Sequence, residues 1–261
     1  MKSILDIDLK SKMRKKIVKE QLDLKCDRCG NRYDYYQFED GTEFRYGCDC
    51  EAIRMAKEST NNYKAKRQRD SIESVFKQSL TNDDLLEANF DNYKPPNNEL
   101  LEAKQTIQKY AANFSRDKPK SLFLQGSFGI GKSHLAMSVV REVKKKGYTA
   151  LFIDVSELVT AYRDTYNKKS ETTEKQLDQL IKNVDLLVID DYGTALSQYG
   201  ISKMFSVANL RTGKNNIITS NNEASELAKT KDMAKIFSRL MKNTEVIKMR
   251  GNDYRLKDFH S

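Results

Sequence analysis

The sequence Gly126-Ser127-Phe128-Gly129-Ile130-Gly131-Lys132-Ser133 decides the fold class, because it matches the pattern G-x-x-x-x-G-K-[ST]. Its glycines let the backbone turn tightly, so that several N–H groups converge on phosphate oxygens. In such a loop Lys132 reaches the β- and γ-phosphates of a nucleotide, and the Ser133 hydroxyl ligates Mg²⁺. The alternative is a glycine turn beside a solvated lysine. A chance match in a chain of this length has odds on the order of one in a hundred, so the sequence predicts nucleotide binding.

The segments around this loop alternate between short apolar runs and amphipathic stretches, the pattern of an α/β domain. A buried strand is predicted over residues 121–125, directly before the loop, and a helix over 132–146, which Gly147 ends. A further helix is expected to continue from Glu157, with Ser156 as its N-cap. The other predicted strands are 148–155, 185–190, 216–220 and 245–249, and the other predicted helices are 98–114, 197–210 and 225–241. Five apolar strands separated by helices indicate a parallel sheet covered on both faces.

Two acidic residues, Asp190 and Asp191, end one of the predicted strands. Beside a phosphate loop, the first carboxylate can hold a hydrated Mg²⁺, and the second can orient or deprotonate an attacking water. A pair of acids after a strand also occurs as a helix cap or a solvated turn. Asn221 follows the next strand and can hydrogen-bond the γ-phosphate or the water, although asparagine is also a common turn residue. These three residues are therefore candidates for catalysis beside Lys132.

Three segments together resemble AAA+ ATPases of the DnaC/DnaI helicase-loader type, to which the transposition helper ATPase IstB is a near relative. The segments are GIGKSHLA at 129–136, LLVIDD at 186–191 and IITSN at 217–221, and the resemblance covers roughly residues 80–261. It implies a P-loop AAA+ domain whose five parallel strands lie in the order 5-1-4-3-2. It also implies an ATPase that converts ATP to ADP and phosphate, and that DNA or a partner stimulates.

The resemblance assigns further roles by position. Asn221 matches the residue called sensor 1, and residues 90–93 match a segment that lies near the adenine. Arg239, in Phe-Ser-Arg-Leu, matches an arginine finger, and Arg255, in Asp-Tyr-Arg-Leu, matches a late arginine near the nucleotide. Asp191 stands where many AAA+ proteins carry Glu. Its shorter side chain is consistent with slow hydrolysis, which suits a switch rather than a motor.

All four cysteines lie in two pairs near the N-terminus, Cys26 with Cys29 and Cys48 with Cys50. Four thiolates at this spacing favour tetrahedral Zn²⁺, and a zinc-stapled hairpin explains how so short a region folds without a large core. Four protein ligands leave no open position, so the predicted site is structural. Four free buried cysteines and an iron–sulfur cluster are the alternatives. The sequence thus predicts a zinc-ribbon-like domain with a helical linker over residues 1–80 and the ATPase domain over 81–261.

The composition limits the class of protein and its partners. The 261 residues carry 46 basic and 37 acidic side chains. The resulting charge of +9 favours a nucleic-acid partner, although a lysine-rich soluble surface gives the same balance. The chain has no long apolar run and its N-terminal segment is charged, so neither a transmembrane helix nor a signal peptide is expected. We therefore expect a cytoplasmic protein that does not bind a membrane.

A mixture of aromatic and basic residues indicates where single-stranded DNA would bind. Tyr162, Tyr166, Lys168 and Lys169 interleave in the predicted ATPase domain, which suits stacking on bases and contact with phosphates. The alternative is a group of tyrosines in a helical core. The resemblance adds residues 197–199 as a second candidate for DNA contact.

These patterns predict an ATP-dependent loader that delivers a hexameric replicative helicase onto single-stranded DNA during replication initiation. The zinc-bearing region is expected to bind the helicase, and the AAA+ domains are expected to associate with one another. One alternative is an IstB-like transposition helper ATPase, which acts on duplex DNA with a transposase. The other is a zinc-containing adaptor whose ATP site senses nucleotide without significant turnover.

Overall fold

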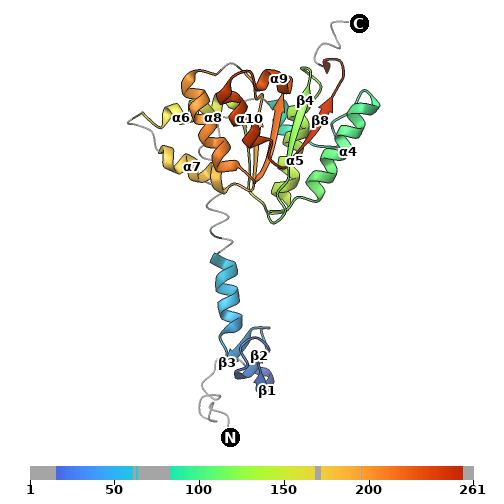
Figure 1. Ribbon diagram of the computed structural model, residues 1–261. Coiled ribbons are helices and arrows are strands. Elements are labelled where there is room, and N and C mark those ends of the chain that lie inside the picture. The colour runs from blue at the N-terminus through green and yellow to red at the C-terminus, as the bar shows by residue number, and fades with distance from the viewer. Residues whose placement is uncertain (1–15, 61–62, 64–82, 168–171, 195, 255–261) are drawn as a thin grey trace. The chain divides into compact units, whose positions relative to one another are not determined.

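The computed structural model describes residues 16–60, 63, 83–167, 172–194 and 196–254 of the chain (Figure 1). The chain divides into two units, Met1–Lys66 and Arg67–Ser261. The domain boundary that the sequence predicts near residue 80 lies outside the described residues. Each unit contains a sheet of its own.

The smaller unit contains an antiparallel sheet in the order β1 (Ile17–Lys25), β2 (Arg32–Phe38) and β3 (Glu43–Tyr46). A helix over residues 50–60 follows the sheet, within the predicted helical linker. Among the described residues of this unit, only Cys26, Tyr36 and Cys48 are buried. Because folding buries so few side chains in this unit, the hydrophobic effect alone contributes little to its stability.

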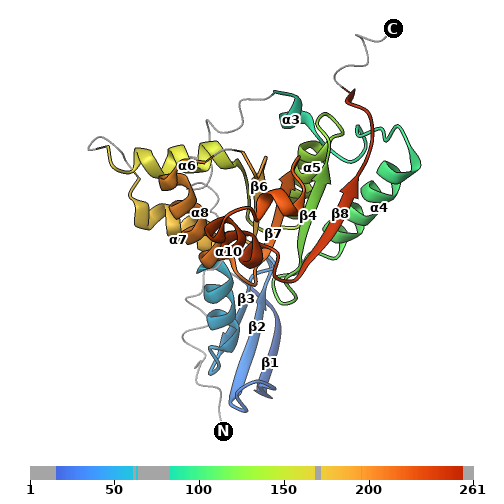
Figure 2. The same cartoon turned by 45° about the horizontal axis from the view of Figure 1, so that its top comes forward.

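The larger unit is built around a parallel sheet of five strands (Figure 2). The strands lie in the order β5 (Ala150–Asp154), β6 (Leu186–Asp190), β7 (Asn215–Ser220), β4 (Ser121–Gly126) and β8 (Thr244–Met249). Numbered one to five along the chain and read from β8, this order is 5-1-4-3-2. The predicted five-stranded parallel sheet and the strand order implied by the resemblance are both confirmed.

Alternate side chains of the strands enter two separate hydrophobic cores. In β4, Leu122 and Leu124 pack with α4 (Asn98–Ala112) and α5 (Lys132–Lys145), and Phe123 packs on the opposite face. The second core is completed by α6 (Val155–Asp164), α7 (Glu174–Asn183), α8 (Gln198–Arg211) and α10 (Lys231–Leu240). Figure 2 shows the two groups of helices on either side of the sheet. Because both faces are covered, the middle residues of β4, β5 and β6 form continuous apolar runs rather than alternating with polar residues.

Several helices differ from the predicted ones. The Asp154 side chain caps α6 by accepting the Ser156 N–H at 2.6 Å, so the prediction that Ser156 is the N-cap is wrong. The helix predicted at 225–241 is two helices, α9 (Ala224–Leu227) and α10, because Thr230 caps a new start. Two further helices, α3 (Asp83–Glu87) and α7, were not predicted from the sequence.

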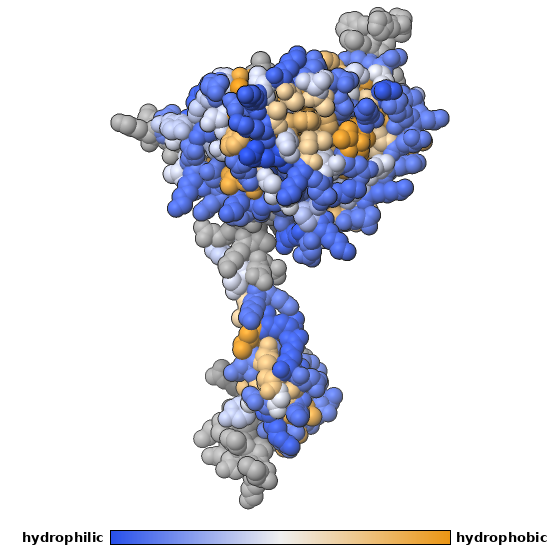
Figure 3. Space-filling model, in the orientation of Figure 1, coloured by the Kyte–Doolittle hydropathy of each residue, from blue (hydrophilic) through white to orange (hydrophobic). Residues whose placement is uncertain are grey.

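No helix in the described ranges is both long enough and apolar enough to cross a membrane. Figure 3 shows a mostly hydrophilic face, with apolar residues gathered near the β8 edge of the larger unit and on the smaller unit. Among the described residues of the smaller unit, the exposed large apolar ones are Val18, Leu22, Phe44, Tyr46, Ile53, Met55 and Tyr63.

Candidate functional site

The phosphate loop joins β4 directly to α5, whose first residue is Lys132. Gly129 and Gly131 both have left-handed backbones, with φ of +68° and +87°. A Cβ at Gly129 would lie 1.6 Å from the Asp253 carboxylate, and one at Gly131 would lie 2.4 Å from the Tyr93 ring. These positions therefore require glycine on grounds of both conformation and space. The start of α5 lies at the end of the loop, where a helix favours anions.

Lys132 is buried at the mouth of the loop, although it carries a charge. Its Nζ donates hydrogen bonds to Gly126 O at 3.0 Å, to Ser127 O at 2.6 Å and to Asn221 Oδ1 at 2.6 Å. The Asn221 contact joins the first residue of α5 to the residue that follows β7, although the two residues lie 89 positions apart in the sequence. The ammonium is thus held close to the loop backbone, where phosphate oxygens can compete for it.

Asp190 lies opposite the start of α5 and accepts two hydroxyl hydrogen bonds on one oxygen. Ser133 Oγ donates to Asp190 Oδ1 at 3.0 Å, and Thr219 Oγ1 donates to the same atom at 2.6 Å. Burial raises the pKa of Asp190 to about 6, and the two hydroxyls oppose that rise. The Asp191 carboxylate raises it further. A carboxylate beside a hydroxyl is a donor set that Mg²⁺ accepts, so Ser133 and Asp190 fit this ion.

Asp191 is linked to both Asn221 and β7. Asn221 Nδ2 donates to Asp191 Oδ1 at 3.2 Å, and the Asp191 N–H donates to Thr219 Oγ1 at 3.0 Å. Asp191 also has a positive φ of 51°, a conformation uncommon for a residue with a Cβ. A continuous chain of side-chain contacts therefore runs from Lys132 through Asn221 to Asp191.

Two segments distant in sequence hold the loop from outside. The Tyr93 hydroxyl donates to Ile130 O at 2.8 Å, which places the end of the segment 90–93 against the loop. From the other direction, Ser127 Oγ donates to Gly251 O at 3.1 Å and the Tyr254 N–H donates to Gly129 O at 3.0 Å. The loop tip, Phe128, is 65% exposed.

The sequence analysis assigned no role to Thr219 or to residues 250–254, although Thr219 lies in the segment IITSN and Asp253 and Tyr254 precede Arg255. A signal for Thr219 was present, because it is a polar residue that directly follows Ile217 and Ile218 in a predicted strand. Polar residues at such positions are hydrogen-bonded when they are buried. The segment 250–254 has no comparable pattern. Its contacts with the loop come from the way β8 pairs with β4.

The two arginines named from the resemblance have different outcomes. Arg239 lies on α10, where its guanidinium donates to Lys235 O of the same helix at 3.1 Å and lies 4.6 Å from the centre of the Phe205 ring. Its contacts are therefore on its own helix and on α8 rather than on the phosphate loop. Arg255 lies outside the described residues.

The tyrosines considered for DNA contact do not form one surface. Tyr162 is fully buried and its hydroxyl donates to Asp178 Oδ1 at 2.7 Å, so the prediction that it stacks on DNA is wrong, and the core alternative holds. Tyr166 is 64% exposed. Lys203 Nζ lies 5.7 Å from the Tyr166 ring and 5.5 Å from the Tyr199 ring. The two predicted lysines, at 168 and 169, lie outside the described residues.

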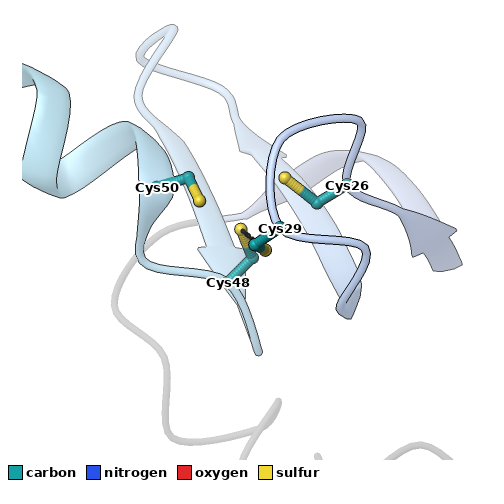
Figure 4. A group of neighbouring side chains, drawn as sticks. All are labelled: Cys26, Cys29, Cys48 and Cys50. Atoms are coloured by element: carbon teal, nitrogen blue, oxygen red, sulfur yellow. Dashed lines mark hydrogen bonds between the residues drawn. The ribbon is translucent and has the colours of Figure 1, made fainter.

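Four cysteine thiols converge in the smaller unit (Figure 4). Cys26 and Cys29 lie between β1 and β2, whereas Cys48 lies between β3 and the helix over residues 50–60, and Cys50 is the first residue of that helix. All four Sγ atoms lie within 4.8 Å of one another. Cys29 Sγ lies 3.6 Å from Cys48 Sγ, close to the distance of about 3.8 Å that tetrahedral Zn–S bonds of about 2.3 Å require.

The electrostatics of this cluster also suit a cation. Backbone N–H groups of Cys29 and Arg28 hydrogen-bond the Cys26 sulfur and lower the pKa of this thiol to about 6. The neighbouring thiols of Cys29 and Cys48 raise the pKa of Cys50 to about 12. One thiolate is therefore favoured by the fold, while adjacent thiolates oppose one another unless a cation lies between them. The cluster fits Zn²⁺.

Comparison with known proteins gives a family and a fold. Residues 60–261 match the family model described as IstB-like ATP binding protein. The replicative helicase loader DnaC of Escherichia coli (strain K12) is 33% identical over 146 residues, which cover 54% of this chain and 55% of that protein. The chain thus spans about half the length of this curated relative.

Two solved structures share the architecture of the larger unit. The crystal structure of the DnaC helicase loader aligns with a TM-score of 0.55 and 26% identity over 64% of this chain and 98% of that one. AMPPCP-bound DnaA from Aquifex aeolicus aligns with a TM-score of 0.53 and 21% identity over 66% of this chain and 53% of that one, a likeness of fold alone. The family model covers most of the chain, and members of the family are ATPases in general. This chain belongs to the family of IstB-like ATP-binding proteins.

Proposed function

We propose that this chain binds ATP with Mg²⁺, hydrolyses it, and uses the nucleotide cycle to load a hexameric replicative helicase onto single-stranded DNA. One observation carries the proposal. Lys132, Asn221 and Asp191 are joined by hydrogen bonds beside a phosphate loop, in a chain related to the replicative helicase loader DnaC. A glycine turn without a ligand would not need a buried lysine linked to the ends of two strands.

The residues divide the chemistry among them. The loop N–H groups and Lys132 would bind the phosphates, and Lys132 would exchange its contacts with Asn221 and the loop carbonyls for phosphate oxygens. Ser133 and Asp190 would hold Mg²⁺, which neutralises phosphate charge when bound. Asp191 would orient or deprotonate the attacking water, with Asn221 holding the Asp191 carboxylate in place.

The two units would serve different partners. The smaller unit exposes apolar side chains from both its sheet and its helix, and a zinc site would hold that surface in shape for the helicase (Figure 3). The excess of basic residues and the exposed Tyr166 favour contact of the larger unit with single-stranded DNA. Neighbouring copies would associate through their AAA+ domains when ATP is bound.

A loading assay tests the proposal. A circular single-stranded DNA has no end over which a closed helicase ring can thread. The helicase ring must therefore be opened by a loader before it can encircle this DNA. We expect the purified chain with ATP to raise the amount of replicative helicase retained on such circles, and the Lys132→Ala chain not to do so. Stimulation of a transposase on duplex DNA, with no helicase bound, would instead favour the transposition helper. Loading without ATP turnover would favour the nucleotide-sensing adaptor.

The substitution Asp191→Asn is expected to separate hydrolysis from binding. It keeps the phosphate loop and the size of the side chain but removes the carboxylate that would act on water, a role that contributes on the order of 10²- to 10⁴-fold. We expect single-turnover hydrolysis to fall by about 100-fold or more, with ATP affinity within about threefold of the unchanged chain. Equilibrium titration with a fluorescent ATP analogue supplies the affinity. A loss of affinity as large as that of Lys132→Ala would show that this division of roles is wrong.

Arg239 is expected to act on the ATP of a neighbouring subunit. Its guanidinium lies on α10 and contacts α8 instead of the phosphate loop of its own chain. An arginine finger presented across a subunit boundary stabilises the transition state and raises the rate of hydrolysis by on the order of 10³-fold or more. Arg239→Ala and Lys132→Ala chains should each be inactive alone, yet recover partial ATPase activity when mixed. One chain supplies the loop and the other supplies the arginine.

One outcome of the mixing experiment would contradict the role of Arg239 as a finger. If Arg239→Ala alone retains full turnover, the guanidinium serves only its packing on Phe205 and its bond to Lys235 O. The substitution Lys235→Ala is a matched control on the same exposed stretch of α10, because it preserves the backbone carbonyl that Arg239 contacts. It should leave turnover unchanged.

A further inference from the structure

Thr219 is a polar residue near the end of β7, and it is fully buried. Its hydroxyl is used twice. Oγ1 donates to Asp190 Oδ1 at 2.6 Å and accepts the Asp191 N–H at 3.0 Å. One side chain therefore contacts both members of the acidic pair, one through its carboxylate and the other through its backbone.

The two hydrogen bonds of the Thr219 hydroxyl lie just beyond the end of the ladder between β6 and β7. The ladder between β6 and β7 ends at the pair Ile189 and Ile218. Beyond it, the Tyr192 N–H donates to Thr219 O at 2.8 Å, and Ser220 Oγ donates to Tyr192 O at 2.5 Å. Asp191, in the left-handed region with φ of 51°, lies between these bonds. Side-chain hydroxyls thus continue the connection of β7 to the segment that carries the carboxylates.

Asp190 is held from two sides by different elements. Ser133 comes from the start of α5 and Thr219 from β7, and both hydroxyls donate to the same oxygen, Oδ1. Ser133 is the hydroxyl that would change its bonding when a cation arrives, because its oxygen would become a ligand. Thr219 is the donor that would keep the carboxylate oriented, so that the other oxygen, Oδ2, could face a hydrated cation.

We propose that Thr219 is a positioning residue for Mg²⁺-nucleotide, orienting the Asp190 carboxylate for the cation and holding the Asp191 backbone in the conformation that presents its side chain to the nucleotide. The inference rests on the proposed function, since it concerns the same site. Thr219 would act through the Asp190 carboxylate and the Asp191 backbone, and would not itself contact ATP. Its effect should therefore appear in the contribution of Mg²⁺ to nucleotide binding and not in binding without the metal.

The test compares Thr219→Val with Thr219→Ser in the full chain. Valine keeps the shape and the branching at Cβ but removes the hydroxyl, whereas serine keeps the hydroxyl. The affinity for a fluorescent ATP analogue is measured by equilibrium titration with excess Mg²⁺ and again with EDTA. Mg²⁺ is expected to raise the affinity for the ATP analogue. In Thr219→Val this increase in affinity should be smaller by a factor of about ten or more, because one hydrogen bond to a charged group is lost. Its affinity in EDTA should be unchanged, and Thr219→Ser should stay within about twofold of the unchanged chain in both conditions.

Ser220→Ala is the matched structural control, because Ser220 contacts the same segment through Tyr192 O but does not touch Asp190. If Ser220→Ala lowers the Mg²⁺ gain as much as Thr219→Val does, the effect is a general loosening and the inference is wrong. An unchanged Mg²⁺ gain in Thr219→Val would also overturn it. Thermal unfolding shows whether the valine chain folds, and Thr219→Ala, to which the same expectations apply, replaces it if it does not.

Failure of the proposed function gives a different result from failure of this inference. If the unchanged chain binds the ATP analogue no better with Mg²⁺ than with EDTA, the magnesium–ATP site itself is wrong, and the inference falls with it. If the unchanged chain shows the Mg²⁺ gain and Thr219→Val shows the same gain, only the role of Thr219 is wrong.

Discussion

Lys132→Ala is expected to weaken ATP binding by roughly 100-fold or more, since each hydrogen bond from a charged group contributes about 1.5–3 kcal/mol and the ammonium can contact two phosphates. The loop backbone and the start of α5 would remain, but no other described cation contacts the same carbonyls and Asn221. Turnover should fall below detection for the same reason. Equilibrium titration with a fluorescent ATP analogue and a phosphate-release assay measure the two effects.

The burial of Lys132 makes a folding control necessary. Its removal leaves Gly126 O, Ser127 O and Asn221 Oδ1 without this donor, so part of the effect could arise from a distorted loop. Lys144→Ala changes an exposed lysine on the same helix and should leave binding unchanged. Thermal unfolding of both chains separates lost stability from lost affinity. Normal ATP binding by a folded Lys132→Ala chain would contradict the assignment of the phosphate loop.

The second large effect is expected at the cysteine cluster, where Cys26→Ser should release zinc and unfold the smaller unit. Only Cys26, Tyr36 and Cys48 are buried among the described residues of this unit, so two of its three core side chains belong to the cluster itself. Structural zinc binding provides about 10–16 kcal/mol of apparent free energy in small domains, and in such domains that energy is folding energy. We expect about one zinc per chain by elemental analysis.

Limited proteolysis follows the two units separately. Addition of a strong chelator, like Cys26→Ser, should make the smaller unit sensitive to protease while leaving a stable ATPase fragment, because the two hydrophobic cores of the larger unit contain no cysteine. Asp27→Ser is the matched control, since it changes an exposed residue in the same turn without removing a thiol. Iron with visible absorbance would indicate the iron–sulfur alternative. A metal-free chain with a protease-resistant N-terminal unit would contradict any metal-stabilised cluster.

The ATP cycle and the zinc site are expected to fail independently. Lys132→Ala should still bind zinc, and Cys26→Ser should still bind ATP, because the phosphate loop and the cysteine cluster lie in separate units with separate cores. Helicase loading requires both in the proposed function. Each variant should therefore abolish loading while retaining the property of the other unit, which distinguishes two roles from one general loss of folding.

The sequence alone determined the elements whose signals are local. Continuous apolar runs predicted β4, β5 and β6, because a strand buried on both faces has no polar side to present. The loop at 126–133 was recognisable since its glycines and Lys132 serve a phosphate that imposes the same spacing in any fold. The four cysteines predicted their cluster for the same reason, because tetrahedral geometry restricts the spacing within each pair. Helix ends were less certain, as Asp154 and Thr230 show, because several neighbouring residues can cap equally well.

Only the tertiary structure decided which of these residues meet. The contact of Lys132 with Asn221 depends on β7 lying beside β4, and the bond between Thr219 and Asp190 depends on β7 lying beside β6. The burial of Tyr162 likewise depends on how α6 packs, since its aromatic ring suits a core and a DNA surface equally well. The physical reason is that strand order and helix packing arise from side chains that fill two shared cores, and a local pattern carries no information about its distant neighbours.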